Sequence, residues 1–306
     1  MHKLTVIVLT FNEELHIGRC LASVAHLRAR VLVVDSLSTD KTCAIARDGG
    51  AEVVQNPFVT QAQQFEWAMQ NCDINSEWVL RLDADETIDA QLVANIDGFI
   101  EANGRGHSGA IFHRKHIFLG KWVRFGGRYP LPMLRLFRRG KAHVEQRWMD
   151  EHIVLDEGTA CVLEGGFADD NLNSVGWFID KHNKYATREM LDVMLARIYP
   201  ESNVAIPKAT GLAIRLKRFL KRSVYMKLPY FVRPVCYFLF RYFLQLGFLD
   251  GSRGFAYHFM QGLWYRSLVD LKCLEADRAL AGLSEVEDKI KVLEKLSGYN
   301  LSSYLR

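Results

Sequence analysis

A regular alternation of short apolar strands with amphipathic helices runs through the first hundred residues and constrains the fold most. Runs rich in β-branched residues predict strands, and apolar side chains at helical spacing predict the helices between them. The strands are expected at 4–10, 31–35, 51–55 and 77–86, and the helices at 13–27, 40–50, 60–72 and 89–103. Strands that alternate with such helices form a parallel or mixed sheet covered on both faces, so an α/β fold is predicted.

The pattern changes after residue 105, where two further strands flank a loop rich in glycine and proline. We expect these strands at 109–118 and 133–139 and a helix at 174–197. The last hundred residues are basic, aromatic and helical in pattern, and an amphipathic helix is predicted at 275–297.

The 306 residues suffice for one large domain with an appendage. We therefore expect a first domain at 1–204 and a helical region at 205–306. The six cysteines are scattered without a Cys-x-x-Cys pair, so neither a zinc cluster nor a dense disulfide framework is indicated. The apolar run at the N-terminus is short and is followed by acids, which favours a strand over a signal peptide.

Polar side chains stand where three of the predicted strands end. They are Thr10, Asn12 and Glu13 after the first strand, Asp35 at the end of the second, and Asp83 and Asp85 at the end of the fourth. The carboxyl ends of parallel strands meet at one edge of a sheet, where open α/β folds bind ligands. Two carboxylates separated by one residue can converge there on a hard cation, Mg²⁺ or Mn²⁺, that also binds substrate phosphates.

Each of these groups also has an ordinary structural explanation. Acids after a strand are often solvated loop residues, and one of residues 38–40 can cap the helix that follows Asp35. Thr10 or Asn12 can cap the first helix in the same way. We expect both roles at the second strand, with Asp35 contacting a base or ribose. Polar clusters at three strand ends on one edge favour a ligand site over three unrelated caps.

The net charge of +4 is unevenly distributed along the chain. Residues 197–241 hold ten lysines and arginines and one acid, a net +9, whereas the remainder holds 29 basic and 34 acidic residues. Such a stretch indicates an anionic partner, either a nucleic acid or a membrane surface. Residues 228–249 are mostly apolar but include two arginines and two prolines, so a simple spanning helix is not expected. We predict an anionic membrane surface as the partner, and no nucleic acid.

Three segments together resemble the GT-A domain of inverting family 2 glycosyltransferases. They are TFNEE at 10–14, VVDSLSTDKT at 33–42 and LRLDADE at 80–86, within a resemblance over about residues 3–200. The resemblance implies a GT-A fold and a nucleotide-sugar donor, with a UDP-sugar favoured because Asp35 resembles the residue that reads uracil. It also implies donor contacts at Thr10, Asn12, Glu13, Asp35 and Asp83, and a divalent cation, Mg²⁺ or Mn²⁺, on Asp85 with Asp83.

An inverting transfer needs a base that deprotonates the acceptor hydroxyl on the side opposite the leaving nucleotide. Asp150 and Glu151 are the candidates, and their resemblance to the acidic pair of the family favours Glu151. The alternative is an acidic turn before the strand that follows. Family members often carry a histidine where this chain reads FADDN at 167–171.

Two further groups of residues are candidates for substrate contacts. Arginines suit the geometry of a diphosphate, which nominates Arg128, Arg135 and Arg138, although each could be an ordinary surface residue. His182 and Tyr185 resemble a helix of the lipopolysaccharide-type members of the family, which implies a place on the acceptor side. A structural role for His182 is the alternative.

Together these features predict a metal-dependent hexosyltransferase that moves one sugar to a lipid-linked saccharide of a bacterial cell-surface glycan, such as lipopolysaccharide, exopolysaccharide or a glycan branch. The alternative is a non-catalytic nucleotide-sugar-binding protein of a membrane assembly. We expect a peripheral or monotopic protein on the cytoplasmic face of the inner membrane. The predicted helix at 275–297 could pair two copies into a homo-oligomer.

Overall fold

The computed structural model describes residues 2–145, 152–199 and 228–301, and these form two compact units. The first unit is Met1–Asn173 and the second is Ser174–Arg306. The boundary therefore lies before the helix at 174–197, which we had expected in the first domain. That helix belongs to the second unit because its apolar side chains pack against the later helices.

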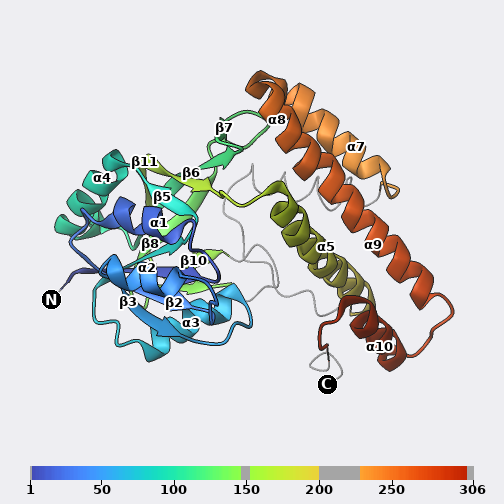
Figure 1. Cartoon of the computed structure of the whole chain (residues 1–306), viewed down its shortest axis with the longest axis horizontal. Helices are drawn as coiled ribbons and strands as arrows, with labels where there is room; N and C mark the ends of the chain where they lie inside the picture. Colours follow the sequence, from blue (N-terminus) through green and yellow to red (C-terminus); the bar gives the residue numbers. More distant parts are fainter. Residues whose placement is uncertain (1, 146–151, 200–227, 302–306) are drawn as a thin grey trace. The chain divides into compact units, whose positions relative to one another are not determined.

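The first unit is built on a mixed sheet with the strand order β3-β2-β1-β4-β8-β6-β11-β5, and β7 pairs with β6 (Figure 1). Strands β3, β2, β1 and β4 are parallel, whereas β8 runs antiparallel to both β4 and β6. The bounds are β1 (Leu4–Thr10), β2 (Ala29–Asp35), β3 (Glu52–Gln55), β4 (Trp78–Asp83), β5 (Glu86–Ile88), β6 (Gly109–Phe118), β7 (Lys121–Val123), β8 (Pro132–Arg138) and β11 (Ala160–Asp170). The predicted α/β fold is confirmed.

Helices cover both faces of this sheet, as the apolar strand pattern predicted. Strand β1 shows why: Val6 and Val8 pack with α1 (Ile17–Val24) and α4 (Ala90–Glu101), while Ile7 and Leu9 pack with α3 (Gln61–Asn71). A strand buried on both faces is mostly apolar, which is the reason for the run LTVIVLT, and its two threonines form hydrogen bonds with Ser76 and Asp35. Helix α2 (Thr42–Asp48) lies between β2 and β3.

The predicted strand at 77–86 is confirmed as far as Asp83 and is wrong only for its last three residues. Strand β4 ends at Asp83, residues 84 and 85 form a turn, and β5 begins at Glu86. Strand β5 leaves β4 and pairs antiparallel with β11 instead. The chain therefore turns away at the pair of aspartates. A two-stranded sheet of β9 (Ala142–Val144) and β10 (Ile153–Leu155) completes the unit.

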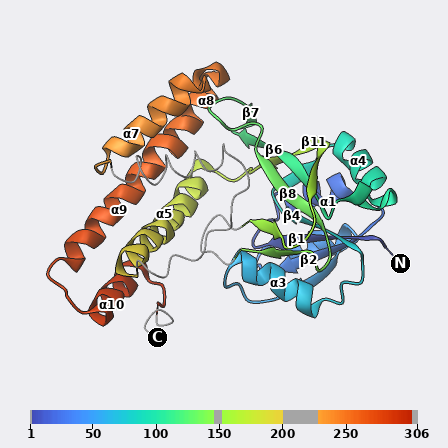
Figure 2. The ribbon, with the colours of Figure 1, turned by 180° about the vertical axis from the view of Figure 1, so that it is seen from behind.

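The second unit is a group of helices around its own core (Figure 2). Its elements are α5 (Val175–Ile198), α7 (Val232–Leu239), a π-helical turn (Phe240–Leu244), a 3₁₀ turn (Gly247–Asp250), α8 (Gly251–His258), a second π-helical segment (Phe259–Trp264), α9 (Tyr265–Leu280) and α10 (Val286–Ser297). Met190 and Met194 of α5 contact the core that Val269 and Cys273 of α9 share with α10.

The single helix predicted at 275–297 is wrong. Helix α9 ends at Leu280, Gly282 adopts a positive φ of 82°, and α10 begins at Val286. A left-handed glycine reverses the chain, so Ile290 and Leu293 turn back onto α5 and α9. The apolar face of α10, which we expected could pair two copies, is therefore largely buried against α5 and α9 of the same chain.

Asp89 begins α4 and joins it to two strands. Its Oδ1 accepts from the amide of Leu92 at 2.9 Å, and its Oδ2 accepts from Lys115 Nζ at 3.0 Å and from the amide of Gly166 at 3.1 Å. Although burial opposes ionisation, these hydrogen bonds and Lys115 hold the pKa of Asp89 below its usual value.

We expect Asp89→Ala to lower the free energy of unfolding by about 1–2 kcal/mol, because a helix cap and two tertiary contacts are lost. Since the folded pKa is lowered, this contribution is present above about pH 4 and disappears as the pH falls through the folded pKa. Urea unfolding at neutral pH and near pH 3 measures both effects. An equal difference between the variant and the parent at the two pH values would contradict the ionic part of this role.

Candidate active site

The ends of β1 and β2 are joined by the side chain of Asp35. Thr10 Oγ1 donates to Asp35 Oδ1 at 3.0 Å, and Asp35 Oδ2 accepts from Gln55 Nε2 at 3.0 Å and from the amide of Ser38 at 2.8 Å. Burial opposes the ionised form, but the hydrogen bonds from Gln55 and Ser38 hold the pKa of Asp35 below its usual value. Asp35 is therefore a buried carboxylate that ties two strand ends together.

This burial differs from the base or ribose contact that we expected of Asp35. The side chain is fully buried, and Ser38 Oγ also donates to Oδ1, so both oxygens already accept two hydrogen bonds. A carboxylate has about four acceptor positions. A nucleoside at this edge would therefore meet the groups that Asp35 holds in place, or replace one of its partners.

Asn12 and Glu13 bridge the loops after β1 and β2. The amide of Asn12 donates to Ser38 Oγ at 2.8 Å, and Asn12 Oδ1 accepts from the amide of Thr39 at 2.9 Å. The amide of Glu13 donates to Thr42 Oγ1 at 2.7 Å. The structural explanation also holds in part, because Asp40 Oδ1 accepts from the amide of Thr42 at 2.9 Å at the start of α2.

His16 links the first loop to the end of β11. It is 1% exposed, its Nδ1 lies 2.5 Å from Glu13 Oε2, and its Nε2 accepts from the amide of Leu172 at 2.8 Å. Because Nε2 is an acceptor, the proton lies on Nδ1, which donates to Glu13. The sequence contained no signal for this contact between residues 156 positions apart.

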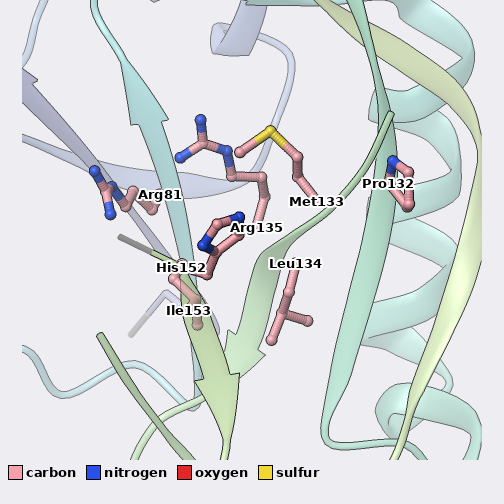
Figure 3. Close-up of a pocket in the computed structure, with 7 residues that line it drawn as sticks. All are labelled: Arg81, Pro132, Met133, Leu134, Arg135, His152 and Ile153. Carbon is pink, nitrogen blue, oxygen red and sulfur yellow. The ribbon is translucent and has the colours of Figure 1, made fainter. Parts of the chain in front are cut away.

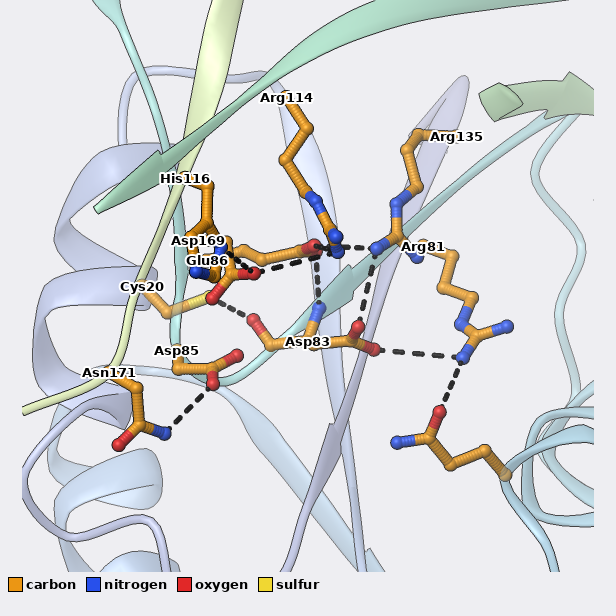
Figure 4. Close-up of polar contacts among 11 residues, drawn as sticks. Cys20, Arg81, Asp83, Asp85, Glu86, Arg114, His116, Arg135, Asp169 and Asn171 are labelled. Atoms are coloured by element: carbon orange, nitrogen blue, oxygen red, sulfur yellow. Dashed lines mark hydrogen bonds and ion pairs between the residues drawn. The ribbon is translucent and has the colours of Figure 1, made fainter. Parts of the chain in front are cut away.

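Asp83 is held by arginines at the end of β4 (Figure 4). Arg135 Nη2 lies 3.2 Å from Asp83 Oδ2 and 2.6 Å from Glu86 Oε1, and Arg81 Nη2 lies 3.7 Å from Asp83 Oδ1. The amide of Asp83 donates to Glu86 Oε2 at 2.9 Å. Arg135 and Glu86 are 3% and 1% exposed, so this is a buried ion-pair network.

The two acids of this network differ in their pKa values. Burial disfavours ionised Asp83, but the positive charges of Arg135, Arg81 and Arg114 outweigh it and hold its pKa below the usual value. Burial raises the pKa of Glu86 to about 8, which Arg135 opposes only in part. Asp83 is therefore the acid that stays ionised.

Arg135 reaches this network because it lies in a β-bulge. Ala110 of β6 pairs with Leu136, and the next residue, Ile111, pairs with Leu134, so Arg135 is the extra residue of β8. A bulge re-aims the side chain of the extra residue, which here points towards Asp83 and Glu86. We had expected Arg135 at a diphosphate, whereas the structure uses it to neutralise two carboxylates.

Asp85 is held by the residues at and just after the end of β11. Its Oδ2 accepts from Asn171 Nδ2 at 3.1 Å and its carbonyl oxygen accepts from the amide of Asp170 at 3.1 Å, so β11 holds this turn (Figure 4). The two carboxylates thus have different neighbours, Arg135 and Arg81 at Asp83 and Asn171 at Asp85. Within the described residues no three carboxylate, histidine or thiol groups are grouped as a metal site.

Residues of β6 and β11 that the sequence did not nominate complete the cluster. Arg114 Nη1 lies 3.6 Å from Asp169 Oδ2 and 3.9 Å from Glu86 Oε1, and His116 Nδ1 lies 3.0 Å from Asp169 Oδ2. Burial lowers the pKa of His116 despite Asp169. The sequence did contain one indication of this cluster, the charged stretch HRKH at 113–116 within an otherwise apolar strand. Charged residues in a buried strand need partners of opposite charge.

The other nominated arginines lie in different places. Arg138 pairs with Trp78, the first residue of β4, so it lies at the opposite end of that strand from Asp83. It forms an ion pair with Glu77 and stacks on Trp78, and its expected place at the donor is wrong because the antiparallel pairing of β8 carries it away. Arg128 lies in the loop before β8 and acts electrostatically on His116.

A small pocket lies beside the arginines of the network (Figure 3). Arg81 and Arg135 line it together with residues 132–134 of β8 and with His152 and Ile153 at the start of β10. The amide of Glu145 donates to the carbonyl of His152 at 2.9 Å, which brings the two sides of this hairpin together. The candidate bases Asp150 and Glu151 lie outside the described residues.

His182 and Tyr185 belong to the second unit. His182 Nδ1 lies 2.8 Å from the carbonyl of Phe178, its Nε2 lies 2.6 Å from Gln261 Nε2, and its ring stacks on Phe178. Tyr185 packs against the core of the same unit. His182 is 8% exposed, so the structural alternative describes its environment better than an acceptor contact does.

Comparison with known proteins agrees with this architecture. The family model of glycosyl transferase family 2 matches residues 5–162, more than half of the chain. The first unit thus has the mixed α/β fold of GT-A domains, and the chain belongs to glycosyl transferase family 2.

Individual relatives match more narrowly. An uncharacterized glycosyltransferase of Rickettsia typhi is 38% identical over 97 residues, which is 32% of each protein, so the match spans about a third of that relative. The lipopolysaccharide core biosynthesis glycosyltransferase LpsC of Rhizobium meliloti is 26% identical over 60% of this chain and 69% of its own length. Staphylococcus aureus TarS, solved with UDP-GlcNAc, superimposes with a TM-score of 0.47 at 16% identity over 90% of this chain and 91% of its own.

Removing Arg135 tests the role of the buried network. We expect Arg135→Met to lower the free energy of unfolding by about 3–5 kcal/mol, because the buried Glu86 and the partly buried Asp83 lose their common partner. Arg138→Met is the matched control on the same strand, where a surface ion pair contributes about 0–1 kcal/mol. The double change Glu86→Gln with Arg135→Met should recover part of the loss, as measured by urea unfolding.

The opposite result would support the donor contact that the sequence led us to expect for Arg135. In that case Arg135→Met would unfold at the same urea concentration as the parent but bind UDP more weakly.

Proposed function

We propose that the protein transfers a single sugar, with inversion, from a nucleotide diphosphate sugar to a lipid-linked saccharide of a bacterial cell-surface glycan. A UDP-sugar is the favoured donor, and lipopolysaccharide, exopolysaccharide or a glycan branch is the class of product. Membership of glycosyl transferase family 2 supports sugar transfer, and the similarity to LpsC supports a lipopolysaccharide-type acceptor.

One observation carries the proposal: the polar ends of three adjacent parallel strands lie at one edge of the sheet. Thr10, Asp35 and Asp83 end β1, β2 and β4, and the register pairs Thr10 with Asp35 and Leu9 with Asp83. Ligands of open α/β folds bind outside such an edge. The bonds between the loops after β1 and β2 hold these ends at fixed positions before a donor arrives, which lowers the entropic cost of binding.

The residues at this edge fit a divalent cation that substrate phosphates help to bind. Asp83 Oδ1 is buried and accepts no hydrogen bond from any described residue. Mg²⁺ is commonly bound by one or two carboxylates, water and phosphate oxygens, so a third protein ligand is not required.

Asp85 is the residue that we assign to the cation, with Asp83 behind it. Asn171 orients the Asp85 carboxylate, and its own Oδ1 accepts from the amide of Asn173 at 3.0 Å, which fixes the orientation of the amide. A bound Mg²⁺ or Mn²⁺ supplies positive charge that stabilises the leaving diphosphate. The protein contributes orientation, since Asn171 and the arginine network leave the two aspartates little freedom.

The base that we propose is Glu151, with Asp150 as the second candidate. The support is the hairpin of β9 and β10, because His152 and Ile153 at its base line the pocket beside Arg81 and Arg135. Glu151 directly precedes the lining residue His152 in the chain. The acceptor hydroxyl would lose its proton to this acid while the donor bond to the diphosphate breaks.

We also propose that the protein works at the cytoplasmic face of the inner membrane as a peripheral or monotopic protein. A lipid-linked acceptor would be met there, and the net +9 of residues 197–241 suits an anionic surface. None of the helices in the described residues has the length and apolar content to cross a bilayer.

The central prediction concerns Asp85. We expect Asp85→Asn to lower kcat/KM for divalent-dependent sugar transfer by about 10³-fold, because the carboxylate that binds the cation loses its charge. Asp48→Asn, an exposed aspartate at the end of α2, is the control and should leave the rate unchanged. A screen of nucleotide sugars by metal-dependent hydrolysis supplies the assay. If Asp85→Asn keeps full divalent-dependent activity, the assignment is wrong.

Changes at the candidate bases separate the enzyme from the non-catalytic alternative. We expect Glu151→Gln to abolish transfer yet bind UDP as tightly as the parent, because only proton removal is lost, and Asp150→Asn to have a smaller effect. Calorimetric titration with UDP and a transfer assay measure the two properties. A parent protein that binds the nucleotide sugar but neither hydrolyses nor transfers it would support the assembly-protein alternative.

A further inference from the structure

The second unit exposes an unusual amount of apolar surface between α7 and α8. We call residues 239–249, which contain the π-helical turn and the first three residues of the 3₁₀ turn, the apolar tip. Phe243, Leu244 and Leu249 are 54%, 76% and 50% exposed there. Val232 and Val235 continue the surface along α7 and are 45% and 44% exposed. Contiguous apolar surface of this kind marks an interaction site.

The charged residues of the same segment point inwards. Arg233 Nε donates to Asp270 Oδ1 of α9 at 2.7 Å, and both residues are nearly fully buried. Arg241 contacts the ring and hydroxyl of Tyr237 and is 6% exposed. Asp250, the only acid in residues 228–264, is 3% exposed. The helices have therefore reversed the usual arrangement, with charges inside and large apolar side chains outside.

The surface that remains is apolar with a positive bias. Arg253 of α8 is exposed, and no exposed acid is present in residues 228–264. The preceding sequence, residues 197–227, adds eight of the ten lysines and arginines that make the basic stretch. Apolar side chains flanked by basic residues suit a bilayer with anionic headgroups, because the two parts meet the acyl region and the phosphates respectively.

We propose that the apolar tip inserts into the interfacial region of an anionic bilayer and is the membrane contact of this protein. The tip lies at one end of the pair formed by α7 and α9, which lie side by side in both views of the ribbon (Figures 1 and 2). An insertion at this depth needs no spanning helix, since interfacial segments bury only their apolar face. The proposal rests on the membrane location given above and names its structural element.

The test uses the full-length protein with vesicles of phosphatidylcholine, with and without phosphatidylglycerol. We expect flotation with the anionic vesicles that persists in high salt, because apolar insertion is not screened. The double change Phe243→Asp with Leu244→Asp should weaken binding at least about tenfold. Val162→Asp, a change at a residue that is 53% exposed on β11 of the first unit, is the matched control and should bind like the parent.

A second measurement needs no variant. Cys236 on α7 is exposed, beside Val235 and Leu239, whereas Cys161 lies partly exposed on β11. We expect anionic vesicles to slow the reaction of Cys236 with a water-soluble maleimide at least about tenfold, as peptide mass spectrometry shows, and to leave Cys161 unchanged. Equal reactivity with and without vesicles, or binding that survives the tip changes, would overturn the proposal.

These outcomes are separable from those for sugar transfer. Metal-dependent hydrolysis of the donor in detergent-free buffer needs no membrane. Activity without vesicle binding would therefore contradict the membrane contact of the tip and leave the proposed sugar transfer standing. If the tip instead covers a second copy, the parent will sediment as a dimer, the tip changes will give a monomer, and vesicles will not bind. That result would also overturn the proposal.

Discussion

The first unit depends on one buried guanidinium group, that of Arg135. It lies between Asp83 and Glu86, 2.6 Å from Glu86 Oε1, at the place where β4 ends and the chain reverses into β5. The buried Glu86 and the partly exposed Asp83 lie close together because they share this positive charge. Because Arg135 comes from β8, Asp83 from β4 and Glu86 from β5, a single charge joins three strands at the edge where the site forms.

Because of this ion pair, Asp83 and Asp85 have different surroundings. Asp83 faces the arginines and has a lowered pKa, while Asp85 turns towards Asn171 of the segment after β11. From the sequence we expected Asp85 at the cation and Asp83 at the donor or the cation, and we did not expect arginine partners for Asp83. In the structure Asp83 is paired with arginines, whereas Asp85 is hydrogen-bonded to Asn171. Residues 169–172 therefore contact both the turn at Asp85 and helix α1, since Asn171 bonds to Asp85 and Asp170 pairs with Arg19 at 2.8 Å.

Much of the fold could be predicted because it depends on local signals. The apolar run of β1 and the helical spacing of α1, α3 and α4 follow from how each segment is buried, and their positions are confirmed. The reversal after Asp83, the role of Arg135 and the break at Gly282 were missed. Arg135 and Arg138 are three residues apart and chemically alike, yet a bulge and an antiparallel register place one in the network and the other at the far end of β4.

The sequence by itself determined the α/β class, the strand ends that carry Thr10, Asp35 and Asp83, and the separation of a basic, apolar C-terminal region. Periodicity and composition encode these, because each depends on residues close together in the chain. Only the tertiary structure decided which charges are neutralised and which surfaces stay exposed. Arg135 and Glu86 are 49 residues apart, and Arg233 and Asp270 are 37 apart. Such pairs form only when strands or helices meet, so no local pattern could predict them.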